Sequence, residues 1–195
     1  MSEIELPNVE EIEELKEKAF TRRVALVTAV FAVALAVTSL GGNNATKEMM
    51  LAAQQATNQW AFYQAKTIRE NLSRNIKAQL QVVLNAGIDT IKPEARKQIE
   101  SELRRLDDEV DRYGLEKTEI EKQAKQFEAE RDTNRAKDPY FDYAEVLLQI
   151  AIVMASIAIL SASRLIFFFA LGFAVVGSLF SMNGFFLILQ IPFLH

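Results

Sequence analysis

Apolar and charged residues are segregated along this chain rather than interleaved. Three long apolar runs occupy residues 24–40, 144–163 and 165–189, and a charged region separates the first run from the other two. A helix needs about 17 to 25 mostly apolar residues to cross a bilayer, so each run is long enough. Glu145, at the edge of the second run, is the one ionisable residue within them. The pattern predicts three transmembrane helices, the last two joined by a tight turn beside Arg164.

Small residues recur within the first two runs at steps of three and four. Steps of this size stay on one face of a helix, and faces of small side chains let helices approach closely in lipid. We therefore expect two packing faces, formed by Ala25, Ala29, Ala32 and Ala36 in the first run and by Ala151, Ala155, Ala158 and Ala162 in the second.

The positive charges nearest the first run predict its orientation. Lys16, Lys18, Arg22 and Arg23 precede it, and such charges tend to remain cytoplasmic. The N-terminus is then cytoplasmic and the charged middle region extracytoplasmic. An acidic arm precedes the run, and "SLGGNN" after it is a mediocre cleavage site, which favours a retained anchor over a signal peptide.

The first half of the middle region predicts one arm of a helical hairpin. "GGNN" at residues 41–44 is expected to break or bend the chain after the first run, because Gly and Asn tolerate left-handed turns. Gly87 and Pro93 are expected to mark the tip of the hairpin. Between these signals, a helix over residues 46–84 is expected to present an apolar face made of Met49, Ala53, Ala56, Trp60, Tyr63, Ile68, Leu72, Ile76, Leu80 and Val83.

The returning helix carries a more regular seam. Lys117 is its one polar interruption, and Pro139 is expected to break the helix near the membrane surface. Apolar residues spaced by fours and threes indicate a coiled coil. The seam consists of Ile99, Leu103, Leu106, Val110, Tyr113, Ile120, Ala124 and Phe127.

These elements together predict an all-α integral membrane protein, with three transmembrane helices and a long antiparallel helical hairpin or coiled coil. We expect an acidic N-terminal cytoplasmic helix over residues 1–23 and a first span over 24–40. The extracytoplasmic hairpin then covers 41–143, the second span 144–163, and the third span with the C-terminal end 164–195.

The stretch "NQWAFYQAKTIRE", residues 58–70, contains the only Trp of the chain. Folding the hairpin about its tip brings it near the returning helix. Two interpretations remain open: packing of one helix on the other, and an aromatic surface for a partner, which a second copy would reconcile. The candidate packing or partner interface is Trp60, Tyr63, Gln64, Ile120, Ala124 and Phe127.

Several segments carry a resemblance to a known family. "RRVALVTAVFAVALAVTSL", "NQWAFYQAKTIRE", "FDYAEVLLQIAIVMASIAIL" and the terminal "NGFFL" resemble, in this order and spacing, a bacterial membrane family known only as a domain of unknown function. The resemblance implies three spans with a charged helical insert in the bacterial cytoplasmic (inner) membrane. It implies no catalytic residue.

The composition argues against several kinds of functional site. The net charge is −4, without the concentrated basic surface that nucleic acid requires. There is no Cys, and the single His is His195, so neither a metal site nor a Ser–His–Asp set is expected. In "DPYFDYAE" the acids Asp138, Asp142 and Glu145 accompany two tyrosines, which favours anchoring at the membrane interface over a weak cation site.

The sequence therefore favours a structural role. We expect a membrane protein that contacts lipid and forms a homo-oligomer through its spans and coiled coil, or joins a larger membrane complex as an accessory subunit. The alternative is a homo-oligomeric channel or transport component whose uncharged pore is lined by Ser, Thr, Gln149 or Asn183. No enzymatic activity, cofactor or nucleic-acid partner is expected.

Overall fold

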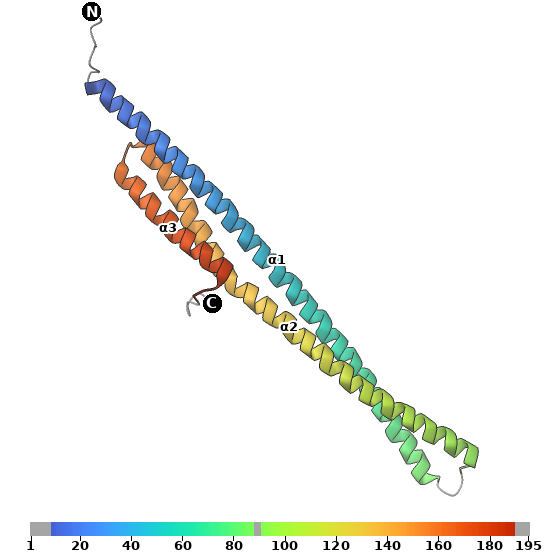
Figure 1. Ribbon diagram of the computed structural model, residues 1–195. Helices are drawn as coiled ribbons and strands as arrows, with labels where there is room; N and C mark the ends of the chain where they lie inside the picture. The colour runs from blue at the N-terminus through green and yellow to red at the C-terminus, as the bar shows by residue number, and fades with distance from the viewer. Residues whose placement is uncertain (1–8, 88–90, 190–195) are drawn as a thin grey trace, which may run out of the picture. The chain divides into compact units, whose positions relative to one another are not determined.

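The computed structural model describes residues 9–87 and 91–189, and within them the chain is all-α, as the sequence predicts. Three helices and no strand occur in this part: α1 (Val9–Ala86), α2 (Pro93–Leu160) and α3 (Arg164–Phe186) (Figure 1). They form two compact units, here called the three-helix unit (Met1–Met49 and Thr133–His195) and the hairpin unit (Met50–Asp132). The predicted acidic arm lies partly, and His195 entirely, outside the described residues.

The three-helix unit packs α3 and the ends of α1 and α2 side by side (Figure 1). Its core joins large side chains of α1 and Leu148 of α2 to alanines of α2 and α3. Ala151 and Ala155 have no exposed surface, so neighbouring helices can approach α2 closely. The buried core cluster consists of Val24, Phe31, Leu148, Ala151, Ala155, Ala170 and Ala174.

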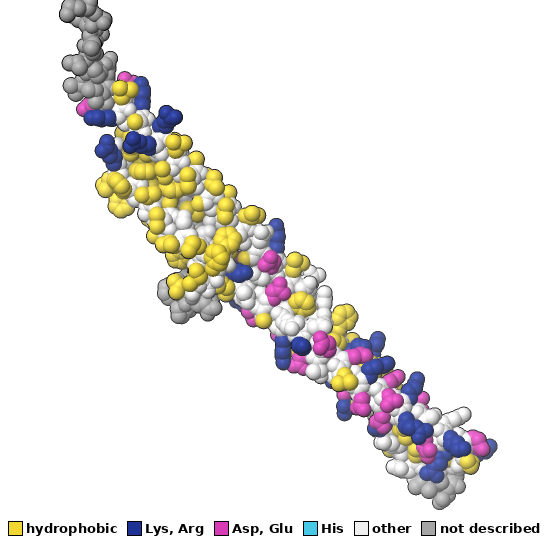
Figure 2. Space-filling view, viewed as in Figure 1, with side chains coloured by type: hydrophobic (Ala, Val, Ile, Leu, Met, Phe, Trp, Pro, Cys, Tyr) yellow, Lys and Arg dark blue, Asp and Glu magenta, His cyan; other side chains and the backbone are white. Residues whose placement is uncertain are grey.

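The outer surface of the three-helix unit is also apolar. Val30, Val33, Phe168 and Leu179 are among many large hydrophobic side chains that are more than half exposed. Figure 2 shows hydrophobic side chains covering the visible face of this unit. Each of the three helices contains a stretch that is long and apolar enough to cross a membrane, by length and composition.

The expected break at residues 41–44 is wrong, because α1 continues through all of them. Gly41 and Gly42 serve packing instead. A Cβ atom on Gly41 would lie 2.6 Å from Phe185 Cζ and 2.7 Å from Phe141 Cε1. The glycines leave room for an aromatic side chain, and the helical backbone needs no turn there.

The expected break at Pro139 is wrong as well, since Pro139 lies inside α2. Its nitrogen carries no hydrogen, so one helical bond is lost. The residues that follow are well packed: Tyr140 and Phe141 are buried, and the Tyr140 hydroxyl donates to the Leu189 carbonyl oxygen at 2.9 Å. These contacts accompany an uninterrupted helix on both sides of the proline.

The tight turn between the second and third apolar runs occupies residues 161–163, between the end of α2 and the start of α3. Ala162 has φ 48°, in the left-handed region that non-glycine residues seldom occupy. It therefore does not belong to the helical face that was expected to include Ala151, Ala155 and Ala158.

The hairpin unit contains two antiparallel segments, residues 50–86 of α1 and residues 93–132 of α2. Trp60 contacts Glu128, whereas Lys77, farther along α1, contacts Asp107. The unit is smaller than the predicted 41–143 hairpin, because residues 41–49 and 133–143 pack within the three-helix unit.

The expected apolar face of the first hairpin helix is wrong in its second half. Ile68 is 68% exposed and Leu72 is 58% exposed, whereas Glu70 is only 6% exposed and Ser73 is also buried. This half of α1 turns polar side chains toward α2 and apolar ones outward, because α2 presents Lys117 and other charged groups in its seam.

Gly114, in the hairpin unit, has no packing role like that of Gly41, since nothing lies within 4 Å of the Cβ atom that a larger residue would carry. We therefore expect Gly114→Ala to stabilise the hairpin unit by up to about 1 kcal/mol, the helix-propensity difference between the two residues. Hydrogen exchange of hairpin amides in the full-length protein would measure this. Gly87→Ala is the matched control and should not stabilise, because its Cβ would lie 2.7 Å from Ile91 Cδ1.

Candidate functional site

The aromatic stretch of α1 faces charged side chains of α2. The Trp60 indole nitrogen donates to Glu128 Oε1 at 2.9 Å, and the Trp60 and Tyr63 rings meet edge to face at 5.6 Å. Lys117 Nζ lies 5.5 Å from the centre of the Tyr63 ring, within range of a cation–π interaction. Both aromatic side chains therefore contact groups within the chain.

A buried ion pair lies next to these rings. Lys117 Nζ is 2.5 Å from Glu70 Oε2, and Arg74 is 2.6 Å from Glu70 Oε1. The hydrogen bond from Lys117 is the main cause that lowers the pKa of the Glu70 carboxyl, against the opposing effect of burial. Glu70 and Lys117 thus form a neutralised pair inside the helix–helix seam.

Other polar contacts continue this seam on both sides of Glu70. Lys66 Nζ lies 2.5 Å from Glu116 Oε2 and 5.4 Å from the centre of the Tyr113 ring. Its hydrogen bond lowers the pKa of Glu116. Ser73 Oγ donates to Glu109 Oε2 at 3.2 Å. The hairpin is therefore held by matched polar groups as well as by apolar packing.

The predicted interface residues have different environments in the hairpin unit. Ala124 is fully buried and Ile120 and Phe127 are half-buried, whereas Gln64 is exposed. The sequence reasoning missed Glu70, the partner of Lys117. The sequence did contain a signal for this pair, namely Lys117 in an otherwise apolar seam. A buried lysine is costly without an opposite charge, so an acid was to be expected on the facing helix.

The outward side of α1 in the hairpin unit carries an apolar face. We call the set Leu51, Phe62, Ile68, Leu72, Val82 and Val83 the outer apolar face; five of the six are more than half exposed and Val83 nearly so. Charged residues on this segment are few: Lys66, Glu70, Arg74 and Lys77 form ion pairs, and Arg69 is the one remaining charged residue between 50 and 86. The α2 segment, in contrast, is rich in exposed acids and bases.

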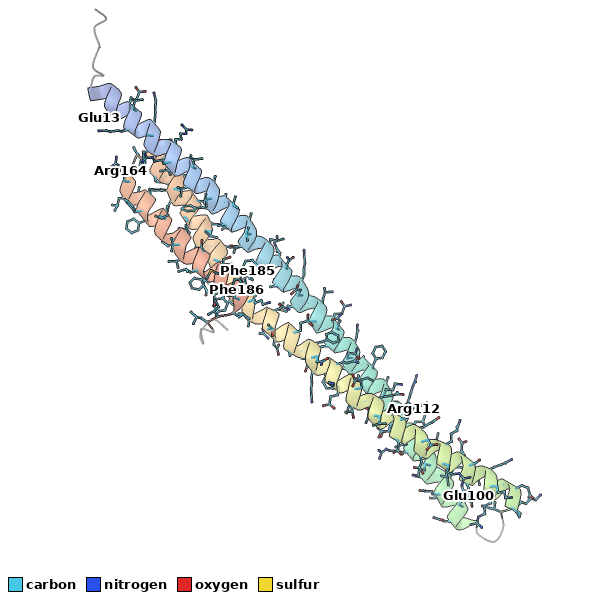
Figure 3. All side chains as sticks on the ribbon, viewed as in Figure 1. Glu13, Glu100, Arg112, Arg164, Phe185 and Phe186 are labelled. Carbon is cyan, nitrogen blue, oxygen red and sulfur yellow. The ribbon has the colours of Figure 1, made fainter. Side chains whose placement is uncertain are left out.

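A second feature, in the three-helix unit, is the enclosure of Phe141 by glycines. Phe141 is 2% exposed. Cβ atoms added at Gly41, Gly42 or Gly184 would each lie 3.1 Å or less from it, and its ring meets Phe185 edge to face at 5.0 Å. Glycines on α1 and α3 therefore shape the space for a ring on α2. Figure 3 labels Phe185 at the C-terminal end of α3.

Most polar groups of the apolar runs are satisfied within the chain. Thr38 donates to Ser181 Oγ at 2.8 Å, and both residues are buried. The Asn183 amide exchanges two 2.8 Å hydrogen bonds with the Leu189 backbone. Gln149 differs, since its side chain is exposed and has no hydrogen-bond partner among the residues that the structure describes.

The predicted alanine faces differ in their surroundings. Ala151, Ala155 and Ala158 are completely buried. Ala25, Ala29, Ala32 and Ala36 lie on the exposed side of α1, since the buried stripe of that helix runs instead through Val24, Phe31, Thr38, Gly41 and Ala45. That these alanines pack on another helix stays a prediction.

The acidic segment at the start of the second run holds Asp138, Asp142 and Glu145. Partial desolvation, together with the charges of Asp138 and Glu145, raises the pKa of Asp142. Asp138 accepts a hydrogen bond from Thr46 at 3.0 Å. Among the described residues, no group of three or more His, Cys, Asp or Glu side chains is arranged to hold a metal ion.

Comparison with known proteins gives a family but no activity. Neither the search of curated proteins nor the search of solved structures found a match to this chain. One family model matches residues 20–187, which include the whole hairpin unit, the first two apolar runs and most of the third, in agreement with the resemblance seen in the sequence. The chain belongs to the family described as a domain of unknown function, DUF4337.

Proposed function

We propose that this chain is an integral membrane protein that crosses the bacterial cytoplasmic membrane three times and self-associates as a structural or scaffolding component. The N-terminus is cytoplasmic and the hairpin extracytoplasmic in this proposal. Three apolar helical stretches and the hydrophobic outer surface of the three-helix unit support insertion into lipid. Such a surface would otherwise be an aggregation liability in water.

The observation that carries self-association is the outer apolar face of the hairpin unit. Both ends of this unit continue, through residues 41–49 and 133–143, into apolar runs, so copies in one bilayer would present their hairpins on the same side of it. Two such copies pack in parallel, and each residue near the symmetry axis meets its own counterpart. An uncharged face suits this arrangement, whereas the charged α2 surfaces would bring like charges together.

Gln149 supports a second contact, between spans. Its amide is exposed on an otherwise apolar part of α2. In lipid, an amide without a partner is costly, and hydrogen bonding to a neighbouring helix relieves that cost. Together with the exposed alanines of α1, Gln149 provides the three-helix unit with a surface that suits another copy.

Disulfide crosslinking tests the proposal, since the natural chain has no Cys. We expect Leu72→Cys in native membranes to give an oxidised species at twice the 22.0 kDa chain mass. Glu119→Cys, an exposed position of the returning helix, is the matched control and should stay monomeric. Native mass spectrometry of gently extracted protein would give the copy number and reveal any second protein.

Two results would contradict self-association through the hairpin. Equal crosslinking of both variants would indicate random collision. A discrete homo-oligomer whose Leu72→Cys variant does not crosslink would confine the contact to the spans. A mass that requires another protein would make this chain an accessory subunit of a larger complex.

A further inference from the structure

The three-helix unit contains a basic pocket at the end where α3 begins. The pocket has a volume of about 400 Å³ and is lined by residues of α1 and α3, among them Lys16, Phe20, Arg23, Arg164, Phe167 and Phe168. Figure 3 labels Arg164 at the N-terminal end of α3, and Figure 2 shows Lys and Arg side chains gathered beside the hydrophobic surface there.

The charges of the pocket have a single sign. Lys16, Arg23 and Arg164 come from two helices far apart in the sequence, and no acidic side chain of the described residues lines the pocket. None of the three forms an ion pair with a described residue, although nearby Lys18 pairs with Glu14 at 2.5 Å. Three exposed cations at one pocket, without an ion-pair partner among the described residues, favour the binding of an anion.

The walls of the same pocket are aromatic. The Phe20 and Phe167 rings meet edge to face, with centroids 6.1 Å apart, and Phe168 is 65% exposed beside them. On one side of the cations α1 enters its apolar run, and α3 is apolar from Leu165 onward. The pocket thus combines a site for negative charge with an adjoining hydrocarbon surface, which is the chemistry of an anionic amphiphile.

We infer that this pocket binds the phosphate headgroup of an anionic phospholipid, whose acyl chains lie along Phe168 and the apolar surface of α3. The inference rests on the proposed membrane insertion, with the N-terminal side cytoplasmic. Basic groups between helices at the cytoplasmic face suit anionic headgroups. The pocket would prefer anionic lipids over neutral ones at this end of the three-helix unit.

Native mass spectrometry of the full-length protein tests this, with phosphatidylglycerol and phosphatidylethanolamine of identical acyl chains as probes. We expect preferential retention of phosphatidylglycerol. Arg23→Gln with Arg164→Gln should weaken its binding on the order of tenfold. Arg22→Gln with Lys47→Gln, which removes the same charge outside the pocket, should change it less than about twofold.

Three outcomes would overturn the inference: equal losses in the two double variants, equal binding of the two lipids, or displacement of the lipid by inorganic phosphate at comparable concentration. The last would assign the pocket to a small anion. If the double variant fails to fold, Arg164→Gln compared with Arg22→Gln makes the same comparison. The mass of the lipid-free protein reports self-association separately.

Discussion

Gly41→Ala should destabilise the three-helix unit by about 2 kcal/mol, while Gly172→Ala should not destabilise it and can stabilise it by up to about 1 kcal/mol through helix propensity. The added methyl group at residue 41 would lie 2.6 Å from a ring atom of Phe185, which is partly exposed, and 2.7 Å from a ring atom of Phe141, which is buried. Inserting a carbon into such a site costs about 1–3 kcal/mol. Nothing lies within 4 Å of the corresponding position at Gly172.

Thermal unfolding of the purified protein in a mild detergent would measure the difference between the two variants. If the clash is with Phe141, then Phe141→Leu introduced together with Gly41→Ala should recover part of the loss, because the two sites are in contact and their effects are not additive. Equal stability of the Gly41 and Gly172 variants would show that the glycines do not shape the space around Phe141.

Glu70→Leu should loosen the hairpin unit by about 2 kcal/mol, because it leaves Lys117 beside α1 without its acid. Lys117→Leu should cost a similar amount. The double variant should regain most of the loss, since apolar pairs often replace buried ion pairs without a net cost. What the double variant would lose is specificity of register, the best-attested role of polar groups in such seams.

Hydrogen exchange of hairpin amides in the full-length protein would follow these changes. Glu102→Gln, in an exposed pair with Arg105, is the matched control and should have little effect. Additive losses in the Glu70 and Lys117 double variant would show that the two side chains do not act as a pair.

The Glu70 pair also predicts a dependence on pH. The pKa of Glu70 is lowered in the folded hairpin from its usual 4.5, so the unfolded chain binds more protons in the acidic range. The stabilisation is fully present above the usual pKa and is lost as pH falls through the folded pKa. Glu70→Gln should reduce this acid sensitivity, whereas Glu102→Gln should not.

The sequence by itself determined the parts of this protein that depend on length and periodicity. The three apolar runs and the short turn before Arg164 could be located because segments without charge are unmistakable. The seam of the returning helix could be read for a similar reason: Leu106, Tyr113 and Ala124, which the heptad pattern selected, are all buried.

The tertiary structure alone decided where helices continue and which faces meet. Gly41 and Pro139 are local signals whose cost, about 1–3 kcal/mol each in a helix, is offset by tertiary packing, in which burial of a side chain such as Phe141 contributes a similar amount. The rotation of α1 about its axis in the hairpin was likewise set by the facing helix α2. By its own sequence, α1 could bury either the face with Glu70 or the face with Leu72. Lys117 on the opposite helix requires the acid, so Leu72 faces outward.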